Sequence, residues 1–180
     1  MKHFTYTPGT GGNFIACLLY HSRYNKWIDG LQNNEYGCEG YIKQIKFSHY
    51  ITIDPTIILH EPDKTYLFKK LTILLYKRYM AGRDLKPDTR LAINSLKHNG
   101  EYEFQLQRQI KRVVDFRHVY TWSSLFYNIN RDSWIELFDF FKYDFRDEYL
   151  THIENYSKRN EEIFNSDETI RIRQFLQKYT

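Results

Sequence analysis

The residues whose types and spacing best suit chemistry lie near the N-terminus, where residues 7–14 read TPGTGGNF. Three glycines separate an alternating run that predicts a strand over 2–7 from an apolar run that predicts a helix over 12–29. Glycines at such a junction let backbone N–H groups approach a ligand, and the helix presents its positive end there. We therefore expect a cradle for a phosphate or sulfate group. The residues expected to form it are Pro8, Gly9, Thr10, Gly11, Gly12, Asn13 and Phe14.

A simpler interpretation of the same segment needs no ligand. Pro8 and Gly9 then form an ordinary turn, and Asn13 caps the following helix. If the loop binds an anion, a side chain added at Gly12 is expected to occupy the position where the anion binds. If the loop is instead collapsed onto neighbouring side chains, its glycines have a structural role.

Length and composition predict a single domain over 1–180, because 42% of the 180 residues are hydrophobic. The formal net charge of +4 favours an anionic ligand but is too small to predict specific nucleic-acid binding. No apolar run is long enough to span a membrane, so no membrane partner is expected. The first predicted strand begins within three residues of Met1, which leaves no room for a signal peptide. The expected location is the cytoplasm.

Cysteine and histidine spacing predicts neither a disulfide framework nor a metal site. Cys17 and Cys38 form no CxxC motif, and the seven histidines show no HxH or HExxH spacing. Sixteen Tyr and thirteen Phe accompany little Ala, a bias typical of AT-rich genomes such as those of some viruses and phages.

The remaining pattern predicts an α/β fold with a small parallel sheet flanked by helices and a helical C-terminal third. Asp63 is expected to cap a helix that Gly82 ends, and residues 83–100 form a polar, unpatterned segment. The expected strands cover 46–54, 56–59 and 113–116, and the expected helices cover 64–81, 101–111, 132–141, 146–160 and 167–178.

The loop differs from two common nucleotide-binding loops. It lacks the Lys and Ser/Thr of a Walker A sequence, and it lacks the spacing and downstream acidic residue of a dinucleotide-binding fold. Residues 7–15 instead resemble the phosphosulfate-binding loop of the sulfotransferase family, usually written Tyr-Pro-Lys-Ser-Gly-Thr-Thr-Trp-Leu. The positions that match in type are Pro8, Thr10, Gly11, Phe14 and Ile15.

Later segments match the family's landmarks in order. Residues 46–49 look like its Lys-Thr-His strand end, which holds the catalytic base. Residues 56–63 are similar to its Ile-Ile-Tyr-Val-Arg-Asn-Pro strand, which meets the 3′-phosphate, and residues 113–119 resemble its Tyr-Glu-Asp-Leu strand. The resemblance covers roughly residues 1–145.

The resemblance implies a three-layer P-loop-type fold that binds 3′-phosphoadenosine 5′-phosphosulfate. It implies transfer of the sulfuryl group to an acceptor hydroxyl or amine, with His49 as general base and His60 near the 3′-phosphate. The sequence specifies neither the acceptor nor an oligomeric state.

Three departures from the family pattern matter for catalysis. Gly9 stands where the family has the loop Lys, His60 where it has Arg, and Phe68 where it has Ser. Loss of two cations should cost orders of magnitude in rate, because sulfuryl transfer depends on positioning and charge stabilisation. An active enzyme would need substitutes, for which the candidates are Lys64, Lys69, Lys70 and Arg117.

Two other functions stay open. A catalytically degenerate protein with a structural or interaction role, conceivably viral, would also lack these cations. A divergent nucleotide or small-molecule kinase would need a Mg²⁺-binding carboxylate, for which Asp54 and Asp115 are the candidates.

Each candidate side chain also has a structural interpretation. His49 fits a hydrogen-bonded strand histidine, His60 can close a turn, and Asp115 can have a purely structural role. The basic residues Lys69, Lys70, Lys77 and Arg78 suit the solvated face of an amphipathic helix. An aromatic cluster is expected to pack the C-terminal helices onto the sheet; it comprises Tyr120, Trp122, Phe126, Tyr127, Trp134, Phe138, Phe140 and Phe141.

Overall fold

The structure, a computed structural model, describes residues 2–7, 9–27, 45–48, 57–97 and 119–180. Several expectations fall outside these ranges. They are the roles of Pro8, His49, Asp54, Asp115 and Arg117, the helix over 101–111 and the strand over 113–116.

Four short parallel strands form the described sheet, in the order β2-β1-β3-β4. Their bounds are β1 Lys2–Tyr6, β2 Ile45–Ser48, β3 Ile57–His60 and β4 Val119–Thr121. Tyr6 pairs with Leu59, and Leu59 pairs with Tyr120, so the three side chains form one row across the sheet. All strands are parallel, so their carboxyl ends meet at one edge, where the segments after β1, β3 and β4 come together.

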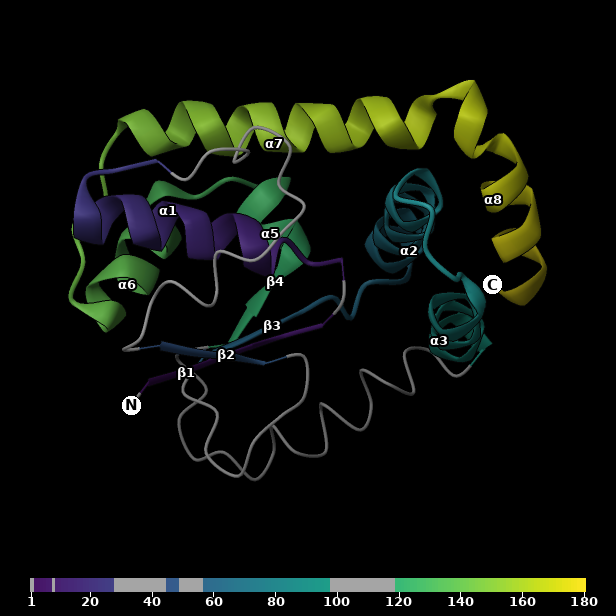
Figure 1. Cartoon of the computed structure of the whole chain (residues 1–180), viewed down its shortest axis with the longest axis horizontal. Coiled ribbons are helices and arrows are strands. Elements are labelled where there is room, and N and C mark those ends of the chain that lie inside the picture. The colour runs from purple at the N-terminus through teal and green to yellow at the C-terminus, as the bar shows by residue number, and fades with distance from the viewer. Residues whose placement is uncertain (1, 8, 28–44, 49–56, 98–118) are drawn as a thin grey trace.

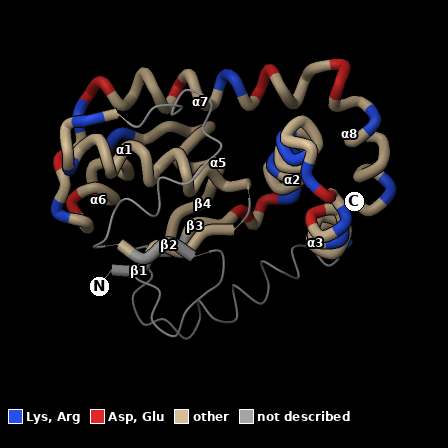
Figure 2. The backbone as a smooth tube through the Cα atoms, in the orientation of Figure 1, with Lys and Arg blue, Asp and Glu red and all other residues tan. Residues whose placement is uncertain are grey.

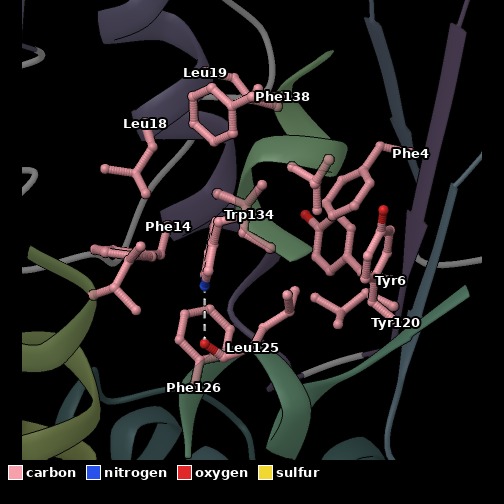
Figure 3. Packing of buried hydrophobic residues seen from close by; sticks show 14 of the residues in the cluster. Phe4, Tyr6, Phe14, Leu18, Leu19, Tyr120, Leu125, Phe126, Trp134 and Phe138 are labelled. Carbon is pink, nitrogen blue, oxygen red and sulfur yellow. Dashed lines mark hydrogen bonds between the residues drawn. The ribbon is translucent and has the colours of Figure 1, made fainter. Parts of the chain in front are cut away.

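Helices α1 (Gly12–Tyr24), α5 (Trp122–Phe126) and α6 (Arg131–Phe141) lie over one face of this sheet (Figure 1). The long helix α7 (Glu148–Asn165) runs across the outer side of α1 and α5. Buried aromatic side chains fill the space between these elements, and Trp134 Nε1 donates to the carbonyl oxygen of Leu125 at 3.1 Å (Figure 3). Every member of the expected aromatic cluster lies in or against this core, which confirms that expectation.

A second group of helices lies beyond the carboxyl ends of the strands (Figure 1). It consists of α2 (Lys64–Met80), α3 (Lys86–Lys97) and α8 (Ile170–Leu176), with short 3₁₀ turns at Asp167–Thr169 and Gln177–Tyr179. These helices share a smaller apolar core; its buried members are Leu67, Leu71, Leu74, Leu75, Ala92, Leu96 and Leu176.

The mixed α/β class and the small parallel sheet are confirmed. No helix among the described residues is long and apolar enough to cross a membrane. The expected cap of α2 is also confirmed, since the Asp63 carboxylate accepts from the backbone N–H groups of Thr65 and Tyr66 at 2.9 and 3.1 Å.

Five details differ from expectation. Helix α1 was expected to continue to residue 29 but ends at Tyr24, because Asn25 adopts a left-handed conformation and its N–H donates to the carbonyl oxygen of His21. Residues 83–100 were expected to lack regular structure, but α3 spans Lys86–Lys97, because Ala92 and Leu96 are buried against α2 and α8. Helix α7 continues five residues past its expected end at 160, to Asn165. The short helix α5 was not predicted; a capping box between Thr121 and Ser124 begins it. Cys17 is disulfide-bonded, although the cysteine spacing predicted no disulfide framework.

Candidate functional site

The glycine loop follows β1, which lies between β2 and β3. Thr7 extends the pairing of β1, because its backbone N–H donates to the carbonyl oxygen of Leu59 at 3.0 Å. Thr10 then turns the chain: its backbone N–H and its Oγ1 both donate to the carbonyl oxygen of Thr7, at 3.2 and 2.6 Å. Both threonines are buried, so the loop is a compact turn fixed by its own hydrogen bonds.

Gly9 and Gly11 adopt left-handed conformations, with φ of +87° and +80°, which other residues rarely adopt. Their neighbours also leave little space. A Cβ atom at Gly9 would lie 3.3 Å from side-chain carbons of Lys70 and Leu74. A Cβ atom at Gly11 would lie within 3.0 Å of the Phe126 ring and the Tyr156 hydroxyl. Helices α2, α5 and α7 therefore all contact the loop.

Gly12 meets a different neighbour. A Cβ atom there would lie 2.3 Å from the ring of Tyr6, on the strand that leads into the loop. A side chain at Gly12 would therefore collide with the protein's own core. The expectation that a side chain at Gly12 would occupy the position of a bound anion is wrong.

The first turn of α1 has no side-chain cap. Gly11 is the N-cap residue and makes no side-chain hydrogen bond to the helix, and no acidic residue lies in the first turn. Asn13 was considered as the cap, but its Oδ1 accepts a hydrogen bond from the Tyr6 hydroxyl at 2.9 Å. The N-terminal N–H groups of a helix need an acceptor, and an anion is one that suits the helix dipole.

A cation reaches this loop from α2. Lys70 is only 2% exposed, and its Nζ donates to Thr7 Oγ1 at 3.1 Å. Its position shares the buried stripe of Leu67, Leu71 and Leu74, so the expectation that Lys70 lies on a solvated face is wrong. Figure 2 shows the basic residues of α2 in relation to the sheet.

In the part of the chain that the structure describes, the other lysines considered as replacements for the missing loop cation do not contact the loop. Lys69 points toward α7, where its Nζ lies 2.7 and 3.0 Å from the two carboxylate oxygens of Glu161 and 4.7 Å from the centre of the Tyr127 ring. Lys64 is exposed at the start of α2. Lys70 is thus the member of the expected set that contacts the loop within the described residues.

A second lysine of α2 lies two helical turns further on. Lys77 Nζ donates to Asn160 Oδ1 of α7 at 3.0 Å and lies 5.4 Å from the centre of the Tyr156 ring. The Tyr156 ring is stacked on Phe14, with centroids 4.5 Å apart. Burial raises the pKa of Tyr156, and a hydrogen bond with Asn160 opposes part of this shift. The hydroxyl therefore remains protonated at neutral pH.

The end of β3 holds two buried polar residues next to β1. His60 is 6% exposed and pairs in register with Thr121 of β4. Glu61 is fully buried, and its Oε1 and Oε2 accept from the backbone N–H groups of Asp63 and Ser123, at 2.9 and 2.7 Å. No sequence pattern predicted this role of Glu61. Its partner Ser123 lies 62 positions away, so no local pattern pointed to it.

The described residues offer little to a metal ion. They contain no group of three or more His, Cys, Asp or Glu side chains that could hold one. Both oxygens of Glu61 already accept backbone hydrogen bonds, which disfavours it as a Mg²⁺ ligand for the kinase alternative. Phe68, at the position where the resemblance to sulfotransferases would place a Ser, packs edge-on against Phe164 with centroids 6.2 Å apart.

Comparison with known proteins finds no matching protein-family model, no matching curated protein and no matching solved structure.

Proposed function

We propose that this protein binds 3′-phosphoadenosine 5′-phosphosulfate at residues 8–14 and transfers its sulfuryl group to an acceptor hydroxyl or amine. The observation that carries the proposal is the buried ammonium of Lys70 on the loop, 3.1 Å from Thr7 Oγ1. Burying an ammonium group is costly unless polar or charged groups compensate it. Lys70 therefore places a positive charge against the loop, in a position that suits an anionic ligand.

Two sources of positive potential meet at this loop. One is the ammonium group of Lys70, and the other is the N-terminus of α1, whose N-cap residue supplies no side-chain acceptor. Preorganised positive groups in a site that excludes water stabilise an anion more strongly than the same groups in solution. The combination suits a phosphosulfate, which carries its charge on terminal oxygens.

The arrangement of the strands supports a P-loop-type, three-layer fold as part of the proposal. Within the described sheet, β1 has a parallel neighbour on each side, and its carboxyl end leads directly into the loop and α1. Ligands of open parallel α/β sheets bind outside the carboxyl ends of the strands.

In the proposed reaction, the acceptor oxygen or nitrogen forms a bond to sulfur while the bond from sulfur to the bridging oxygen breaks. We assign to Lys70 the stabilisation of charge on that bridging oxygen, which replaces the loop Lys absent at Gly9. We assign to His49 the role of the general base that removes the proton of the acceptor. Contact of His60 with the 3′-phosphate stays a prediction.

Calorimetric titration with 3′-phosphoadenosine 5′-phosphate tests the proposal. We expect heat of binding for the wild-type chain and at least a tenfold weaker affinity for Lys70→Met, since a hydrogen bond to a charged group is lost. Lys64→Met is the matched control, because Lys64 is exposed on the same helix, and its affinity should equal that of the wild type. Absence of heat and of a thermal shift at millimolar ligand would overturn the proposal.

The second candidate is a structural or interaction protein without catalysis. It is favoured by the contacts of Tyr6, Phe126 and Tyr156 with the glycine positions, since packing alone then explains the glycines. Absence of binding to both 3′-phosphoadenosine 5′-phosphate and inorganic pyrophosphate, together with strong destabilisation by Gly11→Ala, would favour this candidate over the first.

A further inference from the structure

Helix α3 carries three basic residues on one side. Lys86, Arg90 and Lys97 are all exposed, and the helical repeat places them within about 40° of one another around the axis. Ala92 and Leu96, which are buried in the core shared with α2 and α8, lie on another side of the helix. Lys86 and Lys97 are eleven residues apart, which corresponds to about 16 Å along the axis. These three residues, the basic face of α3, therefore form a row of cations along the helix.

The acidic residues near this face leave its charge positive. Asp88 is the acidic residue of α3, and it lies on the far side, where its carboxylate is 3.6 Å from Arg78 Nε of α2. Asp84, just before the helix, accepts a hydrogen bond from the backbone N–H of Lys86 at 3.0 Å. Among the residues that the structure describes, the side chains of Lys86 and Arg90 form no ion pair. The basic face therefore favours an anionic partner.

A groove beside the basic face combines charged and apolar lining residues. Its volume is about 440 Å³, and it is lined by Lys86 and Arg90 together with Leu85 and Ile93, while Asp84 lies at its start. Leu85 and Ile93 are half-buried, so part of their apolar surface stays exposed. The groove therefore suits a ligand that has both anionic groups and apolar surface.

Aromatic residues lie next to the last cation of the row. Lys97 Nζ is 5.1 Å from the centre of the Tyr179 ring, which meets Phe175 of α8 edge-on with centroids 5.5 Å apart. Phe175 is 36% exposed. Arg171, four residues before Phe175, shares its side of α8, and Lys178 is exposed in the following turn. Basic residues thus continue from α3 to α8 (Figure 2).

We propose that the basic face of α3, together with Phe175, binds single-stranded nucleic acid without sequence preference. A row of cations matches a backbone that carries one phosphate per nucleotide, and exposed aromatic rings provide surfaces on which bases stack. An acidic peptide would also meet the cations, but it carries no flat ring at each unit to cover the apolar groove and the Phe175 ring. The proposal is independent of the proposed sulfuryl transfer, because none of these residues belongs to the glycine loop.

Fluorescence anisotropy with a labelled oligothymidylate of about twelve nucleotides tests the proposal. We expect the wild type to bind at low salt and to lose affinity as salt is added. Replacing Lys86, Arg90 and Lys97 together by Gln should raise the dissociation constant at least about tenfold. The slope of log affinity against log salt should become shallower by about two, since each lost phosphate contact on a single strand removes about 0.7.

The matched control removes the same charge from other elements. Lys26, Lys64 and Lys158 are exposed after α1, at the start of α2 and on α7, and their joint replacement by Gln should leave affinity near that of the wild type. An equal loss in both triple variants would show that net charge alone attracts the oligonucleotide and would overturn the proposal. Absence of binding by the wild type at low salt would also overturn it.

Phe175→Leu tests the stacking contribution, because it keeps an apolar side chain and removes the ring. We expect about fivefold weaker binding of the oligothymidylate. Tyr24→Leu is the control, since Tyr24 is 44% exposed on α1 and should contribute nothing. Unchanged affinity of Phe175→Leu would overturn the role of this ring.

Two competition experiments exclude other occupants. An excess of 3′-phosphoadenosine 5′-phosphate should leave the oligothymidylate bound, because the nucleotide is expected at the glycine loop. Displacement would place the oligonucleotide at that loop and overturn the proposal. An oligoglutamate peptide should compete weakly; if it binds to the basic face more tightly than the oligothymidylate, the face docks an acidic protein segment and the nucleic-acid proposal is wrong.

Discussion

Lys70 Nζ and Thr7 Oγ1 lie 3.1 Å apart, and this contact joins helix α2 to the turn that begins the glycine loop. The two residues are 63 positions apart in the sequence, and both are buried. Lys70 also lies against Gly9, so the same side chain supports the loop conformation and supplies its positive charge.

Removal of the Thr7 hydroxyl should therefore destabilise the fold. Thr7→Val keeps the shape of the side chain but takes an acceptor from a buried ammonium group, which should cost about 1–3 kcal/mol of unfolding free energy. Urea denaturation measures this loss. Thr151→Val, on the exposed side of α7, is the control and should change stability by less than about 0.5 kcal/mol. Equal stabilities of the two variants would contradict the importance of this contact.

Alanine substitutions at Gly82, which follows α2, and at Gly11 and Gly12 of the loop should separate conformational strain from steric overlap. Gly82 has φ of +65° and open space around its Cβ position, so Gly82→Ala should cost about 1–2 kcal/mol from strain alone. Gly11→Ala adds contacts at 2.9–3.0 Å and should cost about 2–5 kcal/mol. Gly12→Ala meets the Tyr6 ring at 2.3 Å and should cost about 3 kcal/mol or more. Chemical denaturation gives this order, and a loss for Gly82→Ala equal to the other two would refute the steric argument.

Local patterns were sufficient for the elements that organise the loop. Alternation predicted β1, the apolar run predicted α1, and Asp63 was placed correctly as the cap of α2. Each of these signals lies within a few residues of the feature that it specifies.

The misplaced site residues depend on contacts between distant segments. Lys70 was assigned to solvent from its charge, although its position shares a helical stripe with Leu67 and Leu74. The helical spacing therefore indicated a buried position for Lys70, but the prediction followed the charge of the side chain instead. The buried position of Glu61 could not be predicted in this way. Its carboxylate accepts a hydrogen bond from the backbone N–H group of Ser123, which belongs to a helix after β4.

Glu61 should be intolerant of a change that keeps its size. In Glu61→Gln one carboxylate oxygen becomes an amide NH₂, which cannot accept from Asp63 or Ser123. One backbone N–H group would lose its acceptor, and we expect a loss of about 1–3 kcal/mol in unfolding free energy. Glu162→Gln on the exposed face of α7 is the control for the change of charge. A loss in the control as large as in Glu61→Gln would show that net charge is responsible.

His21 should make stability depend on pH. It is buried on α1, with its Nδ1 2.9 Å from the Tyr149 hydroxyl and its ring stacked on Trp27 at 3.8 Å. Burial lowers the pKa of His21 below 6.5, and the positive charge of Arg146 adds to this shift. Because the unfolded chain then binds the proton more readily, the stability contribution is complete above pH 6.5. It is lost as pH falls from 6.5 toward the lower folded pKa.

Urea denaturation at pH 8 and pH 5.5 measures this dependence. His21→Asn retains a polar atom near the position of Nδ1 and cannot be protonated, so its stability should fall less than that of the wild type between the two pH values. His152→Asn is the control, because that side chain is exposed on α7 beside Trp27, at a centroid distance of 4.8 Å. It should keep most of the wild-type loss, because the charge of His152 is the smallest of the contributions that lower the pKa of His21. If His21→Asn loses as much stability on acidification as the wild type, the acid sensitivity belongs to other groups.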